Sequence, residues 1–240
     1  MEFQYDYNKI ILKNIAIIPA RGGSKRIPRK NAKFFHGKPI IAYSIEAAIN
    51  SGLYDEVMVS TDDVEIAEIA QKYGAKVPFL RSEKNSNDFA TTADVLLEVL
   101  DFYKKNNQVF EFGTCIYACA PFVNSEILKK SFKLIDKENC DCVFPSIAYS
   151  HPIQRAIKID SIGKIEEFDK RNQNARTQDL EKAFHDAGMF YTFNINKLLK
   201  TKSLRTKNTF SIEIDELHAH DIDSENDWIL AEMKYKLFSK

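Results

Sequence analysis

The sequence lacks a surplus of charge of either sign. Its 240 residues contain 34 Lys and Arg and 34 Asp and Glu, which gives a formal net charge of zero. Proteins that bind nucleic acid usually carry a basic surplus, and no aromatic side chains for stacking are interleaved with the Arg-Gly-Gly stretch at 21–23. We therefore expect no nucleic-acid partner.

Long apolar runs and a secretory leader are also missing. No run reaches the roughly 18 apolar residues that a membrane-spanning helix needs. The opening MEFQYDYNKIILKN has neither the long apolar stretch nor the small cleavage residues of a signal peptide. These absences predict a cytoplasmic protein with no membrane partner.

Cysteine is scarce. The chain has four cysteines and no Cys-x-x-Cys pair, which argues against a zinc site. Cys115 and Cys142 lie in apolar segments, as expected for buried thiols in strands. With 44% hydrophobic and 28% charged residues, the composition is typical of a soluble globular protein, and the length suits one α/β domain.

Apolar strand-like runs alternate with helical patterns through the first two thirds of the chain. The expected strands are 14–20, 56–61, 76–80, 114–121 and 141–146, and the expected helices are 39–52, 63–74, 91–105 and 124–138. This alternation predicts a three-layer α/β fold of Rossmann-like type around a mostly parallel, twisted sheet. Such sheets bind ligands at the carboxyl ends of their strands.

The alternation breaks between residues 147 and 186. This stretch is polar and rich in turn residues, and DSIGK at 160–164 is typical of a hairpin turn. It could be an inserted arm, a lid or a dimer contact. Residues 187–194 restore a strand, and 224–238 form a last amphipathic helix capped by Ser224. We expect one domain over 14–240, preceded by an N-terminal extension at 1–13.

A basic loop follows the first expected strand. Six cationic side chains and no acid lie between Arg21 and Lys33. Gly22 and Gly23 would let the backbone adopt positive φ and approach a ligand, and its N–H groups could converge on an anion. The spacing fits neither a P-loop nor Gly-x-Gly-x-x-Gly. A bound triphosphate would account for the cations, and a solvated basic loop is the alternative.

The segment HDID at 220–223 carries two carboxylates. In an extended chain, Asp221 and Asp223 point to one side, and His218 and His220 point to the other. Carboxylate oxygens suit Mg²⁺ that also keeps waters and bridges phosphates. The alternative for the aspartates is a capping cluster at the start of the last helix.

The motif IIPARGGSKRIPRKN resembles the signature of the acylneuraminate cytidylyltransferases, the CMP-sialic acid synthetase family. The resemblance continues through GKPIIAYSIEAA, VSTDD, FLRS, ATTADVL and HDIDSENDW, from Ile15 to the end of the chain. RSEKNSNDFATTADVL, HPIQRAIKI and QDLEKAFHDAGMFY are most similar to the branch that activates pseudaminic acid.

The resemblance implies a reaction and its participants. CMP would pass from CTP to the anomeric hydroxyl of an acidic nine-carbon sugar, with Mg²⁺ as cofactor. It also implies a homodimer in which the arm at about 147–186 reaches the partner's site. The general base and the number of metal ions stay open.

The resemblance also implies roles for individual residues. The metal-binding aspartates match Asp221 and Asp223, and the catalytic group matches Arg21, Lys30 and, with different flanking residues, Arg176. The nucleotide-binding positions fall on Arg21, Gly22, Gly23, Ser24, Lys25, Lys30, Asn31, Arg81, Ala90 and Thr92.

The expected sugar site departs from the sialic acid pattern. YACAP stands where sialic acid enzymes carry Gln-x-Thr-Ser-Pro, so Tyr117 replaces the glutamine and Cys119 and Ala120 replace hydroxyl residues. Losing hydrogen-bonding groups changes which sugar fits and favours a 6-deoxy sugar such as pseudaminic acid. The sugar-binding candidates are Tyr117, Arg155, Gln178, Asp179 and His185.

Other interpretations stay open at this point. The acceptor could be legionaminic acid, N-acetylneuraminic acid or a shorter acidic sugar such as 3-deoxy-manno-octulosonic acid. A catalytically silent nucleotide-binding subunit is the alternative from another class, although Arg21, Lys30, Asp221 and Asp223 argue against silence.

Overall fold

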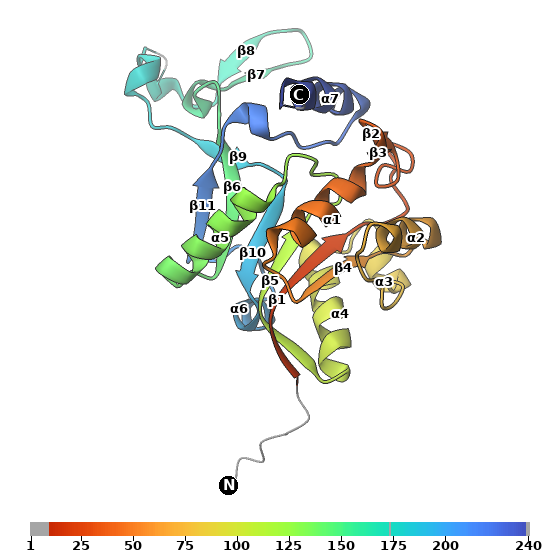
Figure 1. The fold of residues 1–240 in the computed structure, drawn as a ribbon. Helices are drawn as coiled ribbons and strands as arrows, with labels where there is room; N and C mark the ends of the chain where they lie inside the picture. The colour runs from red at the N-terminus through yellow and green to blue at the C-terminus, as the bar shows by residue number, and fades with distance from the viewer. Residues whose placement is uncertain (1–9, 173, 239–240) are drawn as a thin grey trace.

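The computed structural model describes residues 10–172 and 174–238, and Figure 1 shows a central sheet with helices on both faces. In this part of the chain the main sheet has seven strands in the order β11-β6-β10-β5-β1-β4, with β9 added beside β6. The strands are β1 (Ile10–Pro19), β4 (Glu56–Ser60), β5 (Gln108–Ile116), β6 (Cys142–Ala148), β9 (Phe184–Asp186), β10 (Phe190–Asn194) and β11 (Thr209–Glu213).

Strand direction places the carboxyl ends of five strands at one edge. β1 pairs in parallel with β4 and β5, and β11 pairs in parallel with β6. β10 runs antiparallel to both β5 and β6, so these two point the same way, and β9 is antiparallel to β6. The prediction of a mostly parallel sheet is confirmed.

The helices form two layers around this sheet. Residues of α1 (Ile40–Ser51), α2 (Val64–Lys72) and α5 (Ser125–Glu138) pack in the core on one face. Residues of α4 (Thr92–Lys105) and α6 (Ile195–Thr201) pack in the core on the other face. Two further helices are α3 (Glu83–Ser86) and α7 (Glu225–Phe238).

Local sequence explains where the helices begin and end. Asp63 and Asn124 cap α2 and α5 through their side chains, and Thr91 forms a capping box with Asp94 at the start of α4. Gly52, with φ of 65°, closes α1 in the left-handed conformation that glycine adopts without strain. These boundaries agree with the sequence prediction.

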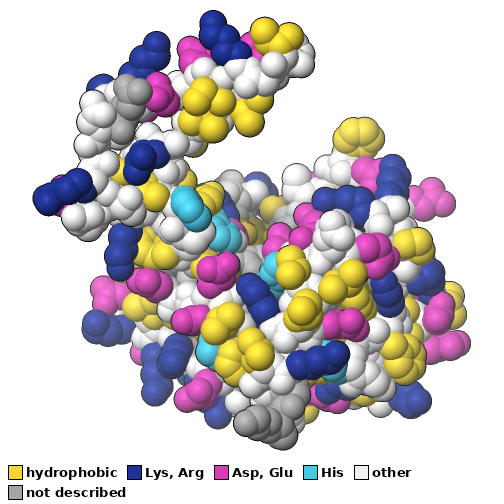
Figure 2. Space-filling view, turned by 90° about the horizontal axis from the view of Figure 1, so that it is seen from above, with side chains coloured by type: hydrophobic (Ala, Val, Ile, Leu, Met, Phe, Trp, Pro, Cys, Tyr) yellow, Lys and Arg dark blue, Asp and Glu magenta, His cyan; other side chains and the backbone are white. Residues whose placement is uncertain are grey.

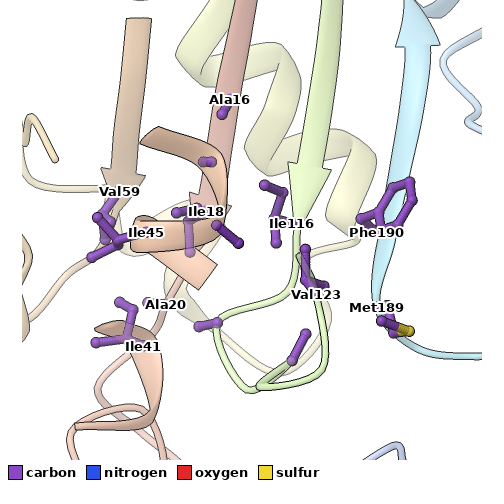
Figure 3. Close-up of a cluster of buried hydrophobic side chains, with 14 of the residues drawn as sticks. Ala16, Ile18, Ala20, Ile41, Ile45, Val59, Ile116, Val123, Met189 and Phe190 are labelled. Atoms are coloured by element: carbon purple, nitrogen blue, oxygen red, sulfur yellow. The ribbon is translucent and has the colours of Figure 1, made fainter. Parts of the chain in front are cut away.

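The central strand β1 is buried on both faces. Ala16 and Ile18 belong to the core cluster below α1, and Ile15 and Ile17 belong to the cluster below α4. Figure 3 shows the first of these clusters, in which Ile18 lies among side chains from α1, β4 and β5. A continuous apolar run is what such a two-sided strand requires.

Three local predictions differ from the structure. Residues 76–80 form only an isolated bridge, from Lys76 to Met58, because Pro78 lacks the N–H that a strand ladder uses. The strand expected at 114–121 ends at Ile116. β1 begins at Ile10, so residues 10–12 of the expected extension pair with β5, and residues 1–9 lie outside the described part.

An arm leaves the sheet after β6. Its hairpin pairs β7 (Ile157–Ile159) with β8 (Ile165–Glu167), and the turn contains Gly163 at φ of 86°, as DSIGK predicts. Figure 2 shows the arm standing away from the body of the molecule. A second small hairpin pairs β2 (Phe34–Phe35) with β3 (Lys38–Pro39).

The structure bears on two further expectations, the packing of the cysteines and the lack of a membrane-spanning helix. Cys115, Cys140 and Cys142 are buried free thiols and Cys119 is half-buried, which agrees with the expected packing role. Among the described residues, no helix combines the length and the apolar character that crossing a bilayer requires.

Candidate functional site

A cavity of about 460 Å³ opens at the carboxyl ends of β1, β4 and β5, the edge that the sequence predicts for a ligand. The residues that line it are Pro19, Arg21, Ser24, Lys25, Arg26, Lys30, Asn31, Arg81, Asn85, Asn87, Asp88, Ala90, Thr91, Thr92, Val95, Tyr117 and Asp223. We call it the nucleotide cavity.

The predicted nucleotide-binding residues converge on this cavity from three distant segments. Its lining includes Arg21, Ser24, Lys25, Lys30, Asn31, Arg81, Ala90 and Thr92. Gly22 and Gly23 belong to the same loop but are not among the described lining residues. Tyr117, expected at the sugar, also lines the nucleotide cavity.

The cations of the basic loop are paired with carboxylates of the chain itself. Arg21 Nη1 lies 2.7 Å from Asp88 Oδ1, and Lys25 Nζ binds the other oxygen of the same carboxylate. These contacts, with Lys25 first and Arg21 second, lower the pKa of Asp88. Arg26 Nη2 lies 2.9 Å from Asp223 Oδ1. An incoming triphosphate would compete with these carboxylates.

The two loop glycines do not act as expected. Neither Gly22 nor Gly23 has positive φ. A Cβ added to Gly22 would lie 2.6 Å from Asp63 Oδ2. The backbone N–H of Gly22 donates to Asp62 Oδ1 at 2.9 Å. The left-handed residue of the loop is Arg29, at φ of 54°. Gly22 is therefore required for close approach to the end of β4, and the prediction of a positive φ is wrong.

Lys30 and Asn31 tie the basic loop to the rest of the site. Lys30 Nζ donates to the carbonyl of Ile222 at 2.7 Å and lies 3.7 Å from Asp223 Oδ1. Asn31 Nδ2 donates to the carbonyl of Arg21 at 2.9 Å, and Cys119 Sγ donates to Asn31 Oδ1 at 3.1 Å. Burial raises the pKa of the Cys119 thiol to about 12, so it remains a neutral donor.

Arg81 is a buried cation fixed at the end of β4. Its side chain donates from Nε to Ser60 Oγ at 3.0 Å and from Nη2 to the carbonyl of Ser60. Arg81 N donates to the carbonyl of Thr61 at 2.8 Å. Burial lowers the pKa of Arg81. This bonding presents a rigid guanidinium to the nucleotide cavity.

Asp221 and Asp223 lie together beside the nucleotide cavity. Burial, and then the neighbouring Asp223, raise the pKa of Asp221. The backbone of Gly188 packs so closely on Asp221 that an added Cβ would lie 2.8 Å from Asp221 Cγ. The negative charges of two neighbouring carboxylates repel each other, and a bound hard cation would offset this repulsion. Asp221 and Asp223 therefore form a pair of oxygen ligands that suits such a cation.

The alternative role for these aspartates, capping α7, is filled by other residues. Ser224 N donates to Asp227 Oδ2 at 2.7 Å, and Asp227 N donates back to Ser224 Oγ at 3.3 Å. Ser224 therefore caps α7, as predicted. Within the described residues, no group of three or more His, Cys, Asp or Glu side chains is arranged so that it could hold a metal ion.

A second cavity of about 600 Å³ opens at the carboxyl ends of β6 and β11. The residues that line it are Phe144, Ser146, Tyr149, Phe184, His185, Asp186, Arg205, Ser211 and Glu213. We call it the distal cavity. It contains His185, one of the predicted sugar-binding residues.

Aromatic rings connect the two cavities. Tyr117, in the nucleotide cavity, meets the Tyr191 ring edge-on at 6.0 Å between ring centroids. Tyr191 in turn contacts Phe144, in the distal cavity, at 5.5 Å. Burial raises the pKa of Tyr117, so its hydroxyl stays neutral.

The remaining candidates lie on the arm. Arg155, Gln178 and Asp179 are exposed and are not among the described residues that line either cavity. Arg176 is also exposed and pairs with Asp179, with 2.7 Å between Nε and Oδ2. Within one chain, the structure does not bring these four residues to either cavity, because the arm stands away from the body of the molecule (Figure 2).

A family model described as cytidylyltransferase matches residues 15–237. The chain belongs to this family. The resemblance found in the sequence is thereby confirmed.

Two relatives of this cytidylyltransferase match almost their whole length. This chain is 40% identical over 226 residues to the pseudaminic acid cytidylyltransferase of Campylobacter jejuni, and the match covers 94% of this chain and 97% of the relative. It is 32% identical over 236 residues to the CMP-N,N'-diacetyllegionaminic acid synthase of Legionella pneumophila, with the same coverage of 94% and 97%.

A solved structure supports the fold of this cytidylyltransferase. It is that of a CMP:2-keto-3-deoxy-manno-octonic acid synthetase complexed with CTP, with a TM-score of 0.68 and 18% identity, covering 94% of this chain and 98% of that chain. At this identity the likeness shows the shared α/β fold, which agrees with the sequence prediction.

Sequence reasoning missed two features of this cytidylyltransferase. Asp88 lies between Arg81 and Ala90, two positions that match nucleotide-binding residues of the family. Its place in the segment NSNDFATT could therefore have marked it as part of the nucleotide cavity. Arg205 and Asp186 meet across 19 residues in the distal cavity. No local motif marks Arg205, because its partner is set by how β9 docks on β6.

Proposed function

We propose that this cytidylyltransferase moves CMP from CTP to the anomeric hydroxyl of a nonulosonic acid, with pseudaminic acid as the acceptor. The observation that carries the proposal is the nucleotide cavity, in which Arg21, Lys25 and Lys30 converge beside Asp223. The identity of 40% with the relative from Campylobacter jejuni supports the acceptor.

The chemistry is a substitution at phosphorus. The anomeric hydroxyl loses its proton to the solvent, its oxygen forms a bond to the α-phosphorus of CTP, and the bond from that phosphorus to the bridging oxygen of the β-phosphate breaks, which releases pyrophosphate. Negative charge gathers on the phosphate oxygens in the transition state. Arg21 and Lys25, freed from Asp88, and Lys30 stabilise that charge from fixed positions. Arg81 holds the cytidine end.

Asp221 and Asp223 would hold Mg²⁺, because their crowded carboxylates offer hard oxygen ligands and leave positions for phosphate oxygens. The bound ion would supply charge neutralisation on the phosphates. Lys30 supports this arrangement by binding the carbonyl of Ile222, which holds the segment between the two aspartates against the basic loop.

The acceptor has a chemical feature that bears on its recognition. The Legionella pneumophila relative is named for a sugar with two N-acetyl groups. We propose that the acceptor of this chain likewise carries N-acyl amides, in addition to its carboxylate.

The first test is pyrophosphate release from CTP and Mg²⁺, with pseudaminic, legionaminic and N-acetylneuraminic acids offered in parallel. We expect release with pseudaminic acid at the highest kcat/KM. Release with another of these sugars would keep the reaction and discard the acceptor. A folded protein that binds CTP but releases no pyrophosphate with any of them would favour the silent-subunit alternative.

The metal assignment has its own test. Asp223→Ala should lower kcat by at least about 100-fold, since it removes one of two metal ligands and a partner of Lys30. Asp136→Ala, on an exposed position of α5, is the matched control and should keep full activity. Near-normal turnover of Asp223→Ala would rule out the metal role of Asp223.

A further inference from the structure

Arg26 is a cation of the basic loop that binds a predicted metal ligand. Its Nη2 atom lies 2.9 Å from Asp223 Oδ1, whereas Arg21 and Lys25 pair with Asp88. All three cations line the nucleotide cavity. Arg26 therefore stands between two negatively charged groups, the carboxylate of Asp223 and the triphosphate proposed for this cavity.

The backbone beside Arg26 is anchored, while the Arg26 side chain is accessible. Ile27, the next residue, is fully buried and belongs to one apolar cluster with Ile222, the residue between the two aspartates. The Arg26 side chain is 68% exposed, so it can turn without moving this cluster. Lys30 lies 3.7 Å from the same Asp223 oxygen but also donates to the carbonyl of Ile222 at 2.7 Å. Arg26 is therefore the partner that can leave Asp223.

Arg26 and a metal ion compete for Asp223 Oδ1. Mg²⁺ binds carboxylate oxygens at about 2.0–2.1 Å and demands near-octahedral geometry around itself. A guanidinium at hydrogen-bond distance from the same oxygen places a second positive charge beside the ion, and the two cations repel each other. The ion pair seen in the structure therefore opposes metal binding at this ligand.

A triphosphate offers Arg26 a stronger partner than one carboxylate. A guanidinium forms paired hydrogen bonds to phosphate oxygens, and Arg26 lines the same cavity as Arg21 and Lys25. Turning Arg26 from Asp223 to the phosphates would free Oδ1 for a metal ion. The phosphates would also supply oxygen ligands to that ion.

We propose that Arg26 holds Asp223 in competition with Mg²⁺ and passes to the triphosphate when CTP binds, so that nucleotide binding opens the metal site. This assignment rests on the proposed function. It makes Arg26 a residue that couples the two ligands. CTP would raise the affinity for the metal ion, and the metal ion would raise the affinity for CTP by the same factor.

The test measures two dissociation constants of Arg26→Met, each in the absence of the other ligand. The Kd for Mn²⁺, a spin probe for the Mg²⁺ site, is measured by electron paramagnetic resonance. We expect it to fall about threefold to tenfold, because the competing cation is gone. The Kd for CTP, measured by calorimetry in EDTA, should rise about tenfold, because a charged phosphate contact is lost. Structural damage would weaken both, so opposite changes identify the exchange.

Further variants show where the ion binds and whether charge is the cause. Asp223→Ala added to Arg26→Met should abolish the gain in Mn²⁺ affinity, because the ion loses its ligand. Arg26→Lys keeps a cation near Asp223, so its Kd for Mn²⁺ should stay within about twofold of wild type. Lys105→Met, at an exposed ion pair of α4, should change neither constant. If Arg26→Met does not fold, Arg26→Gln, which is also uncharged, takes its place.

Three outcomes would overturn the assignment: an Mn²⁺ Kd that does not fall in Arg26→Met, a CTP Kd that does not rise, or a gain in Mn²⁺ affinity that survives Asp223→Ala. Neither constant requires an acceptor sugar. A wild-type protein that binds CTP but releases no pyrophosphate with any offered sugar would instead overturn the proposed function.

Discussion

At the scale of single residues, Asp88 is the side chain in the nucleotide cavity that pairs with two cations of the basic loop. It is exposed, and it takes two cations, Arg21 and Lys25, that a triphosphate would need. Its neighbours in sequence are held by local bonds, such as those from Phe89 N and Ala90 N to Asn87 Oδ1. In the proposed function, the triphosphate of CTP would replace Asp88 as the partner of these two cations.

Asp88→Asn should strengthen CTP binding. The amide removes the negative charge that competes with the triphosphate for Arg21 and Lys25, so we expect the Kd for CTP to fall about threefold to tenfold at low ionic strength. Calorimetric titration with CTP measures this change. Asp101→Asn, at an exposed ion pair of α4, is the control. Weaker CTP binding would show that Asp88 contacts the ligand favourably.

Arg81→Lys should weaken CTP binding more than the exchange of one cationic side chain for another suggests. A single ammonium group cannot keep both bonds to Ser60 and fill the same buried space. We expect the Kd for CTP to rise at least about tenfold, measured by the same titration, with the acceptor KM little changed. Unchanged CTP affinity would contradict the role of Arg81 at the cytidine end.

At the scale of elements, the start of α2 is bonded to the basic loop. Asp63 caps α2 by accepting from Ile66 N at 3.0 Å and holds Arg29 through bonds of 2.5 and 2.9 Å. It also lies against Gly22. One carboxylate thus joins a helix end to the basic loop, so helix stability and loop geometry depend on the same group.

Asp63→Asn should destabilise the fold in a pH-dependent way. The bond from Arg29 lowers the pKa of Asp63 below its ordinary value of 3.8, so the stabilisation is present above that pH and is lost as the pH falls through the lowered value. At pH 7 we expect the free energy of unfolding to drop by about 1–3 kcal/mol. Urea unfolding of wild type and variant at pH 7 and pH 3 measures it, and a gap that does not shrink at pH 3 would contradict the assignment.

At the scale of the whole molecule, the arm is the feature that one chain does not explain. Its side chains at 157, 159, 162, 165 and 168 are isoleucines and a phenylalanine, all exposed. Clustered exposed apolar side chains indicate an interaction site. The predicted homodimer, in which the arm reaches the partner's site, would cover them and would also employ Arg155, Arg176, Gln178 and Asp179.

Charges placed on the arm should therefore dissociate the predicted dimer. Ile159→Asp combined with Ile165→Asp puts two carboxylates on the hairpin, and we expect a monomer by sedimentation velocity at concentrations where the wild type is a dimer. Leu199→Asp, on partly exposed α6, is the control and should leave the mass unchanged. A wild-type monomer, or a charged variant that remains dimeric, would contradict this use of the arm.

Mixing two inactive variants tests whether the site is shared between chains. If Arg176 acts in the partner's site, Arg176→Ala and Asp223→Ala chains mixed after reversible dissociation form some heterodimers with one intact site. Random pairing would restore about a quarter of wild-type activity. No recovery from a mixture that has exchanged subunits would contradict a site shared between chains.

The sequence by itself determined the parts of this protein that local physics controls. Strands such as β1 and helices such as α4 follow from apolar periodicity and from caps such as Thr91, whose partners lie within a few residues. The cations of the basic loop and the two carboxylates of HDID also stood out in the sequence by their chemistry, whereas Arg81 was identified only through the family resemblance.

Only the tertiary structure decided which distant groups meet. Asp88 lies 67 residues from Arg21, and Arg205 lies 19 from Asp186, and neither spacing has a periodic signature. The antiparallel course of β10 and the contact between Gly22 and Asp63 likewise depend on how completed elements dock. Docking is set by burial summed over many side chains, so no short stretch of sequence contains it.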